Sequence, residues 1–392
     1  MIPSLKRPNI YFFMLLLAPF IKPVFLDQFA IFNLLYTAWK LCTIAYLFVA
    51  LMPCYFRYHS PREVGGLLCL TLFWMLYSIN CYRAGADFTS TLVGGFSAVL
   101  CFMLITYEAK IGNGWLLLKA AAYLSTILIL LHVATMFLFP TSPSTVFFFG
   151  MDNYSAFYVY PMLSLVLFYH SKLYGRLKAH SLLLALITVF AYIYTRSYTA
   201  AAAGLLFLML LMLYPHFYKI PKIRGVRWFL PLLALVLVLI VKYNIQNKVA
   251  SLLNSMSKGV TLNSRTIIWD HALSLISSKP LFGHGSFTQE QLDAYILYGT
   301  THAHNIFLEL LMRTGIVGTI LYLLFLCGFI PPLKTGKPES HHNFILVASL
   351  ISQLALSFMD FYPVITIFYI FLAFQYSRNL IARPEKSVRR PL

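Results

Sequence analysis

Long apolar runs, separated by short polar connections, follow one another along this chain from Ile10 to Ser377. Twelve of them have roughly the length that an α-helix needs to cross about 30 Å of hydrocarbon. The pattern predicts an all-α polytopic membrane protein, a single membrane domain over residues 1–392 with about twelve transmembrane helices. The predicted spans lie near residues 11–26, 31–52, 66–80, 90–107, 114–139, 154–170, 180–195, 199–215, 228–243, 304–330, 343–359 and 362–377.

The first run contains Pro19 and Pro23 but no small-residue cleavage site. We therefore interpret it as a retained span and not as a removed signal peptide.

Composition agrees with lipid as the surrounding solvent. The chain is 60% hydrophobic and 11% charged, whereas soluble domains carry about 25% charged residues. The net charge of +18 would suit a nucleic-acid partner, but the Lys and Arg residues lie mostly in short connections between apolar runs, as in membrane proteins oriented by their cytoplasmic charges. We therefore expect membrane lipid and no nucleic acid around this chain.

The distribution of positive charge predicts which connections face the cytoplasm. The short connections on the opposite side hold only Arg83 and Arg196. Because cytoplasmic connections are enriched in Lys and Arg, we expect both termini in the cytoplasm, including a basic tail over residues 378–392. The basic set consists of Lys6, Arg7, Arg57, Arg62, Lys110, Lys172, Arg176, Lys178, Lys219, Lys222, Arg224, Arg227, Lys334, Lys337 and that tail.

One connection is long and polar. Residues 244–303, between the ninth and tenth predicted spans, form an extracytoplasmic loop in this topology, and long ordered loops are usually functional. Helical periodicity from Ser264 to Ser278 predicts a helix whose apolar face includes Trp269 and Ala272, and a second short helix is expected over 289–297.

Arg265 begins the predicted loop helix, on its apolar face. A helix N-terminus offers free backbone N–H groups and a positive dipole, so an Arg there favours an anion site, and its guanidinium matches phosphate oxygens in bidentate fashion. Arg196, in a tight connection on the same predicted side, runs against the charge bias. The alternative for both residues is contact with lipid headgroups.

Two His residues, His302 and His304, lie where the loop enters the tenth span. A His ordinarily titrates close to neutral pH, so either can serve as a general base; a polar helix cap is the alternative. Below them, Asn305, Glu309 and Arg313 recur every four residues along one face. Ionisable groups in a span favour a wet cavity, although an interhelical ion pair is equally compatible.

The remaining sequence patterns concern one further polar site and the absence of nucleotide-binding and metal-binding motifs. Asp152-Asn153, at the start of the sixth span, either lines the same cavity or caps that helix, and we favour capping. The chain has no DxD pair, P-loop or GxGxxG, so we expect no nucleotide and no cofactor. The six Cys residues show no metal-ligand spacing, so we expect no metal. A donor carried by the membrane lipid fits these observations better.

Three short motifs resemble the O-antigen ligase and O-antigen polymerase superfamily. They are Ser264-Arg265-Thr266-x-x-Trp269, Lys279-Pro280-Leu281-Phe282-Gly283-His284-Gly285, and His302-Ala303-His304-Asn305-x-x-Leu308 followed by Thr314-Gly315-Ile316-Val317-Gly318. The resemblance implies a GT-C-like membrane fold in a bacterial cell membrane, with the active site on the extracytoplasmic face. It also implies a glycan donor on undecaprenyl diphosphate and a glycan acceptor.

By the same resemblance, Arg196 and Arg265 would bind the diphosphate and His304 would deprotonate the acceptor hydroxyl. The sequence therefore predicts a metal-independent glycosyltransferase of surface-polysaccharide synthesis. We favour a polymerase because Leu262-Asn263-Ser264-Arg265 looks like capsule-type polymerases. The alternatives are a ligase that transfers to lipid A-core or another acceptor, and, from a different class, a flippase of lipid-linked glycan.

Overall fold

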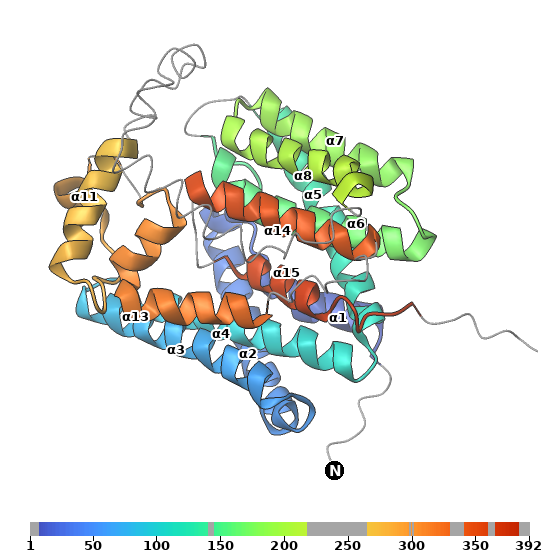
Figure 1. Ribbon diagram of the computed structural model, residues 1–392, viewed down its shortest axis with the longest axis horizontal. Helices are drawn as coiled ribbons and strands as arrows, with labels where there is room; N and C mark the ends of the chain where they lie inside the picture. Colours follow the sequence, from blue (N-terminus) through green and yellow to red (C-terminus); the bar gives the residue numbers. More distant parts are fainter. Residues whose placement is uncertain are drawn as a thin grey trace, which may run out of the picture.

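The computed structural model describes residues 8–139, 145–217, 265–297, 299, 302–329, 341–359 and 365–383. These residues fold into an all-α protein (Figure 1), in which the only β feature is an isolated bridge between Phe147 and Gly150. The helices are α1 (Ile10–Leu17), α2 (Ala30–Tyr58), α3 (Pro61–Arg83), α4 (Phe88–Lys110), α5 (Gly114–Leu138), α6 (Asp152–Tyr174), α7 (Ala179–Tyr194), α8 (Tyr198–Phe217), α11 (Arg265–Ser278), α12 (Gln289–Tyr295), α13 (Ile306–Phe329), α14 (His341–Met359) and α15 (Thr366–Ser377).

Six of the described helices, α2, α3, α4, α5, α13 and α14, are long and apolar enough to cross a membrane. Shorter apolar helices accompany them, and large apolar side chains on their outer faces are exposed, as at Ile31, Leu34 and Val49 of α2. An apolar surface this extensive needs lipid around it. The chain is thus an integral membrane protein with many helices, while the number twelve remains a prediction. The predicted span 228–243 lies outside the described residues.

The first predicted span differs from the structure. Residues 11–26 form a single short helix, α1, followed by two 3-10 turns at Ala18–Phe20 and Val24–Gln28. Eight helical residues extend over only about 12 Å, too little to cross the hydrocarbon. The cause is Pro19, which cannot continue the hydrogen-bonding pattern of α1.

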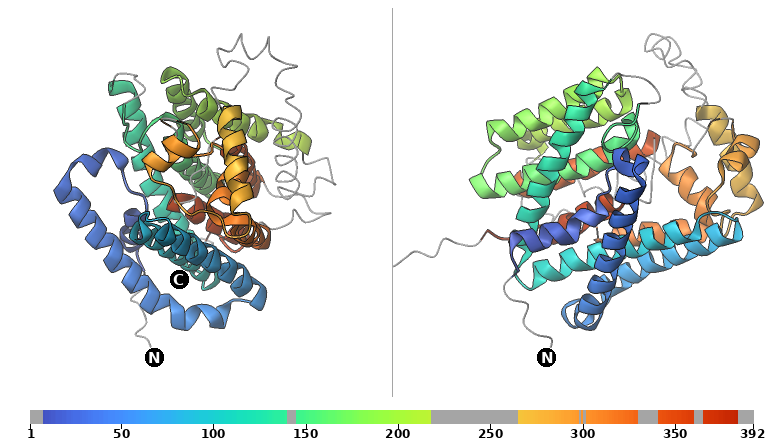
Figure 2. Two further views of the ribbon diagram at one scale, coloured as in Figure 1. Left: turned by 90° about the vertical axis from the view of Figure 1, so that its left-hand side faces the viewer. Right: turned by 180° about the vertical axis from the view of Figure 1, so that it is seen from behind.

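The helices form two groups with α14 and α15 between them (Figures 1 and 2). One group contains α3, α4 and α13, and the other contains α5 to α8. Within the first group, α3 and α13 run antiparallel. The tilted rings of Phe73 and Tyr322 have centroids 5.0 Å apart, while Tyr77, further along α3, accepts a hydrogen bond from Arg313, which lies earlier in α13. The start of α13 therefore lies beside the end of α3. We call this end of the bundle, against which α11 packs, the α11 end.

Positively charged connections meet at the opposite end, which we call the basic end. There Lys110 pairs with Glu63 at 2.6 Å, and Lys172 donates a hydrogen bond to the carbonyl of Arg378 at 3.0 Å. Arg383 reaches the carbonyl of Leu173 at 2.6 Å. Connections that the charge pattern assigns to one side of the membrane thus lie together in the fold.

Close packing of α3 against α13 generates a test with a matched control. A Cβ added at Gly66 would stand 2.5 Å from the ring of Phe329, whereas at Gly65 it would meet nothing within 4 Å. We expect Gly66→Ala to lower the free energy of unfolding in detergent by about 1–3 kcal/mol through overpacking. Gly65→Ala should leave it unchanged or raise it slightly, because Ala is the better helix former. Equal effects of both substitutions on thermal unfolding would contradict this packing.

Candidate functional site

The His pair lies in a strained turn at the start of α13. His304 has a φ of 49°, a conformation that residues other than Gly adopt rarely and that is often associated with function. Its backbone N–H donates to Nδ1 of His302 at 3.0 Å, and the two ring centroids are 3.9 Å apart. Because Nδ1 of His302 accepts this bond, a neutral His302 carries its proton on Nε2. His302 is buried and His304 is half-buried.

Hydrogen bonds on both sides of the turn hold it in this conformation. The backbone N–H of Ala303 donates to Oε2 of Glu309 at 2.7 Å, and the indole N–H of Trp269 donates to the carbonyl of Ala303 at 3.0 Å. Trp269 is fully buried. α11 and α13 are thereby both tied to the residue that precedes His304.

Asn305 fixes the turn from its other side. Its Oδ1 accepts from the backbone N–H groups of Phe307 and Leu308, which makes it the cap of α13, and its Nδ2 donates to the carbonyl of Phe358 in α14 at 3.0 Å. The side chain is fully buried. The predicted stripe of Asn305, Glu309 and Arg313 therefore makes hydrogen bonds and an ion pair inside the protein.

Glu309 and Arg313 form the ion pair that their spacing predicts. Arg313 also bonds side chains from α3 and from the loop after α11. Nη1 of Arg313 donates to the hydroxyl of Tyr77 in α3 and to Oγ of Ser286, both at 2.8 Å. Glu309 is 1% exposed, and Arg313 lies at the level of the last turns of α3. The pair therefore connects the His turn, α3 and the loop after α11 at the α11 end, away from the middle of the bundle.

The motif from Lys279 to Gly285 has a structural explanation. α13 breaks at Gly315, which has a φ of 64°, and the loop inserts its backbone there. The N–H of Ile316 donates to the carbonyl of Pro280 at 2.8 Å, and the N–H of His284 donates to the carbonyl of Met312 at 2.9 Å. The loop thus satisfies backbone groups that the break leaves without helical partners.

Glycine is required at this junction because backbones approach closely. A Cβ at Gly283 would stand 2.6 Å from backbone atoms of residues 313–315, and Gly285 and Gly315 are equally enclosed. Asn80 of α3 completes the junction by donating to the carbonyls of Phe282 and Arg313. Asn80 was not identified from the sequence, and the glycines of the two segments were the available signal for this close backbone approach.

Arg265 begins α11, as predicted, and is half-buried. The predicted loop helix over 264–278 is confirmed as Arg265–Ser278, with Ile268, Trp269 and Ala272 buried. The second predicted helix, 289–297, is present as the shorter α12.

Arg196 occupies the turn between α7 and α8 with a φ of 61°, and its side chain is exposed. The start of α8 is capped by Asn153, whose Oδ1 accepts from Oγ of Ser197 at 3.2 Å and from the N–H of Ala200 at 3.3 Å. α6 begins at Asp152, and its N-cap position is Met151, whose side chain makes no capping hydrogen bond. The cap or cavity role of Asp152 stays a prediction, and its neighbour Asn153 is the residue that caps α8.

The turn that carries Arg196 lies at the same end of the fold as His304. α8 and α14 run antiparallel, because the tilted rings of Tyr214 and Phe344 have centroids 4.9 Å apart and Ser352 donates to the carbonyl of Ala203 at 2.5 Å. Arg196 precedes Ala203 by seven residues, and Phe358 follows Ser352 by six, so both lie about 10 Å further along the pair. Phe358 contacts Asn305, the neighbour of His304.

Arg265 joins the same region through its helix. The ring centroids of Trp269 and Phe358 are 6.2 Å apart, which places α11 against the same end of α14. The α11 end therefore brings together Arg196 from the α7–α8 turn, Arg265 from the start of α11 and the strained His304 from the turn before α13. Within the described residues, no three His, Cys, Asp or Glu side chains cluster so that they could hold a metal ion.

Part of this chain is similar to known proteins. Residues 180–323 match the family model described as O-Antigen ligase, a range that includes α7, α8, α11, α12 and most of α13. The match confirms the resemblance to the O-antigen ligase and O-antigen polymerase superfamily and supports a function of that type. An uncharacterised protein of Haemophilus influenzae is 30% identical over 113 residues, which cover 25% of this chain and 28% of that protein.

The ion pair generates a stability prediction. Glu309→Gln removes the buried carboxylate and leaves the guanidinium of Arg313, whose side chain is 13% exposed, without its ionic partner. Removing one partner of a buried pair costs about 3–5 kcal/mol. We expect a corresponding drop in the free energy of unfolding in detergent. Glu290→Gln, on the exposed face of α12, should change it by less than about 0.5 kcal/mol. The pair would be unimportant if both variants unfolded at the same denaturant concentration.

Proposed function

We propose that this protein is a glycosyltransferase that moves an undecaprenyl-diphosphate-linked oligosaccharide onto an acceptor sugar, with His304 as the general base. The observation that carries the proposal is the strained turn at His304, fixed by bonds from Trp269 and Glu309 inside the segment that matches the O-antigen ligase family. A protein maintains such strain where the geometry of the side chain matters.

The chemistry needs a base and a site for a leaving anion. His304 takes the proton from the acceptor hydroxyl, whose oxygen then attacks the anomeric carbon of the donor sugar. The bond from that carbon to the diphosphate oxygen breaks, and the bonding pair leaves with the diphosphate. Arg265 and Arg196 stabilise the charge that develops on the leaving group.

Neighbouring groups position the base. A neutral His302, accepting from the N–H of His304, fixes the turn without adding a positive charge beside the base. Glu309 and Arg313 act one step further away, because Glu309 contacts the backbone at Ala303 and not the His304 side chain. We assign His302, Asn305, Glu309 and Arg313 to positioning. Asp152 stays a supporting candidate, and we add its neighbour Asn153, which caps α8 beside the turn that carries Arg196.

The charge distribution supports an orientation for this reaction. The basic end would face the cytoplasm, with both termini, and the α11 end would face outward across a bacterial cell membrane. A donor that is anchored in the membrane by its lipid would then present its diphosphate at the height of Arg196 and Arg265.

A flippase remains the alternative from another class. Transporters of this size place their ionisable groups near the middle of the membrane, whereas Glu309 and Arg313 lie level with the last turns of α3. This position favours chemistry at one membrane surface. Between polymerase and ligase, we favour the polymerase.

Substitutions of the three central residues test the proposal. We expect His304→Ala to reduce glycan transfer by about 10²–10⁴-fold, because general-base catalysis contributes that much. Arg265→Ala and Arg196→Ala should each cost about 10²–10³-fold, as expected for the loss of a donor to a developing anion. Arg265→Lys should also be impaired, since an ammonium cannot reproduce the fork of a guanidinium. Transfer is measured by the mass of the glycan product with purified protein.

Matched substitutions at the basic end provide controls. His180→Ala and Arg176→Ala change the same residue types far from the α11 end and should retain wild-type transfer. Wild-type activity in His304→Ala and Arg265→Ala, at normal levels of membrane insertion, would refute the assignment of the site.

A further inference from the structure

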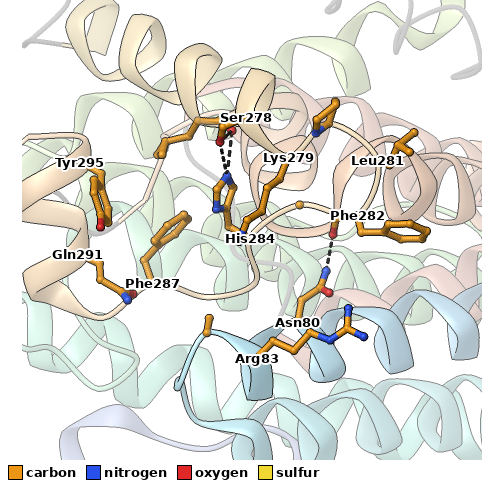
Figure 3. Close-up of a pocket in the computed structure, with 14 residues that line it drawn as sticks. Asn80, Arg83, Ser278, Lys279, Leu281, Phe282, His284, Phe287, Gln291 and Tyr295 are labelled. Atoms are coloured by element: carbon orange, nitrogen blue, oxygen red, sulfur yellow. Dashed lines mark hydrogen bonds between the residues drawn. The ribbon is translucent and has the colours of Figure 1, made fainter.

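A second feature of the α11 end is a cavity of about 830 Å³ between the end of α3 and the loop after α11 (Figure 3). Its volume lies within the roughly 300–1,000 Å³ typical of ligand pockets. α3 contributes Asn80 and Arg83, and α12 contributes Gln291 and Tyr295. The remaining wall comes from the segment between Leu275 and Phe287. We call it the Arg83 cavity.

Positive charge enters this cavity from two sides. Arg83 reaches it from α3 and Lys279 from the end of α11, and both residues are exposed (Figure 3). Neither takes part in any ion pair among the described residues, and no described residue that lines the cavity is acidic. Two uncompensated cations around one space favour a ligand with more than one negative charge, and Arg favours phosphate oxygens.

The height of the cavity in the bundle points to a lipid. Arg83 is the last residue of α3, a helix of 23 residues that is long enough to cross the hydrocarbon. With α3 crossing the membrane, Arg83 would lie at the height of the lipid phosphates. Next to it, Leu281 and Phe282 line the cavity with 57% and 52% of their surfaces exposed, so the rim is apolar. An anion with a hydrocarbon tail satisfies both the charges and the rim.

The part of the cavity formed by α12 has a different character. Tyr295, 58% exposed, and Phe287 offer aromatic faces (Figure 3). Gln291 also lines the cavity; its Oε1 accepts from the backbone N–H of Thr288 at 3.0 Å, so its Nε2 is the atom that can donate to a ligand. Aromatic faces contact the apolar faces of sugar rings, and an amide can bind sugar hydroxyls. Nε2 of His284 is not assigned to sugar binding, because it lies 2.9 Å from the carbonyl of Leu275 and 3.1 Å from Oγ of Ser278.

From these observations we infer that the Arg83 cavity binds the acceptor: a glycan whose lipid diphosphate contacts Arg83 and Lys279 and whose first sugars contact Tyr295 and Phe287. The inference rests on the proposed function and deepens it. A second lipid-diphosphate site, distinct from the one at Arg196 and Arg265, makes the acceptor another lipid-linked glycan and therefore makes the enzyme a polymerase.

The connection between the cavity and His304 supports this assignment. The backbone N–H of His284 bonds the carbonyl of Met312, and Ser286 accepts from Arg313. From Met312 the first turns of α13 lead back to the His304 turn over about 10 Å. A short oligosaccharide anchored at the cavity can extend over this distance, so its far hydroxyl reaches the base.

Binding stoichiometry tests the inference without requiring transfer. The probe is a short-chain isoprenyl diphosphate carrying one oligosaccharide repeat, titrated calorimetrically into the full-length protein in detergent. We expect two equivalents to bind to His304→Ala, which cannot consume the probe. Adding Arg83→Ala and Lys279→Ala should remove one equivalent, or weaken it about ten-fold or more, because each cation supplies charge-assisted hydrogen bonds. The other equivalent should bind as before.

Further variants provide a control for charge removal and test whether the cavity recognises the sugar. Arg176→Ala with Lys178→Ala, an equivalent pair at the basic end, should keep both equivalents. Tyr295→Ala should weaken the glycan-bearing probe at the second site but not the same isoprenyl diphosphate without sugar. Thermal unfolding of every variant is measured beside the titration, so that a binding loss is counted only in folded protein.

The inference fails if His304→Ala binds a single equivalent, or if removing Arg83 and Lys279 leaves two equivalents intact. It also fails if phosphatidylglycerol vesicles displace the second equivalent as well as the probe does, since the cavity would then bind phospholipid headgroups. Failure of the proposed function is a separate result: wild-type protein would form no glycosidic bond, whatever the stoichiometry.

Discussion

The buried pair of Glu309 and Arg313 is the interaction on which the α11 end depends. Glu309 holds the backbone of the His turn, while Arg313 holds Tyr77 of α3 and Ser286 of the loop after α11. A buried ion pair gains little net stability on its own, because desolvation offsets much of the Coulomb attraction. Its value here is specificity of arrangement: three segments distant in sequence can satisfy the pair only when all are in place.

The docked loop and the break at Gly315 follow from the same constraint. Arg313 lies two residues before Gly315, where the backbone leaves the helical path, and the loop from Lys279 to Gly285 bonds the backbone groups on both sides of that break. The loop in turn forms a wall of the Arg83 cavity. One junction thus shapes both the surroundings of His304 and the space that we assign to the acceptor.

Periodicity predicted much of this architecture. The apolar face of α11 and the spacing of Glu309 and Arg313 are local patterns, and both are present in the structure. Long-range consequences could not be predicted in this way. The approach of α8 to α13 depends on how both pack against α14, and the bond from Asn80 to Phe282 joins residues 202 positions apart. The prediction of a first transmembrane span from hydrophobicity was wrong, because Pro19 limits α1 to 8 helical residues.

The central claim is that the α11 end forms glycosidic bonds. The most direct measurement supplies wild-type protein in proteoliposomes with undecaprenyl-diphosphate oligosaccharide as the only glycan, and follows lipid-linked products by mass. The account predicts a ladder of longer lipid-linked glycans, formed at the membrane surface that the α11 end faces. Movement of the unchanged substrate to the opposite leaflet, with no new bond, would contradict it.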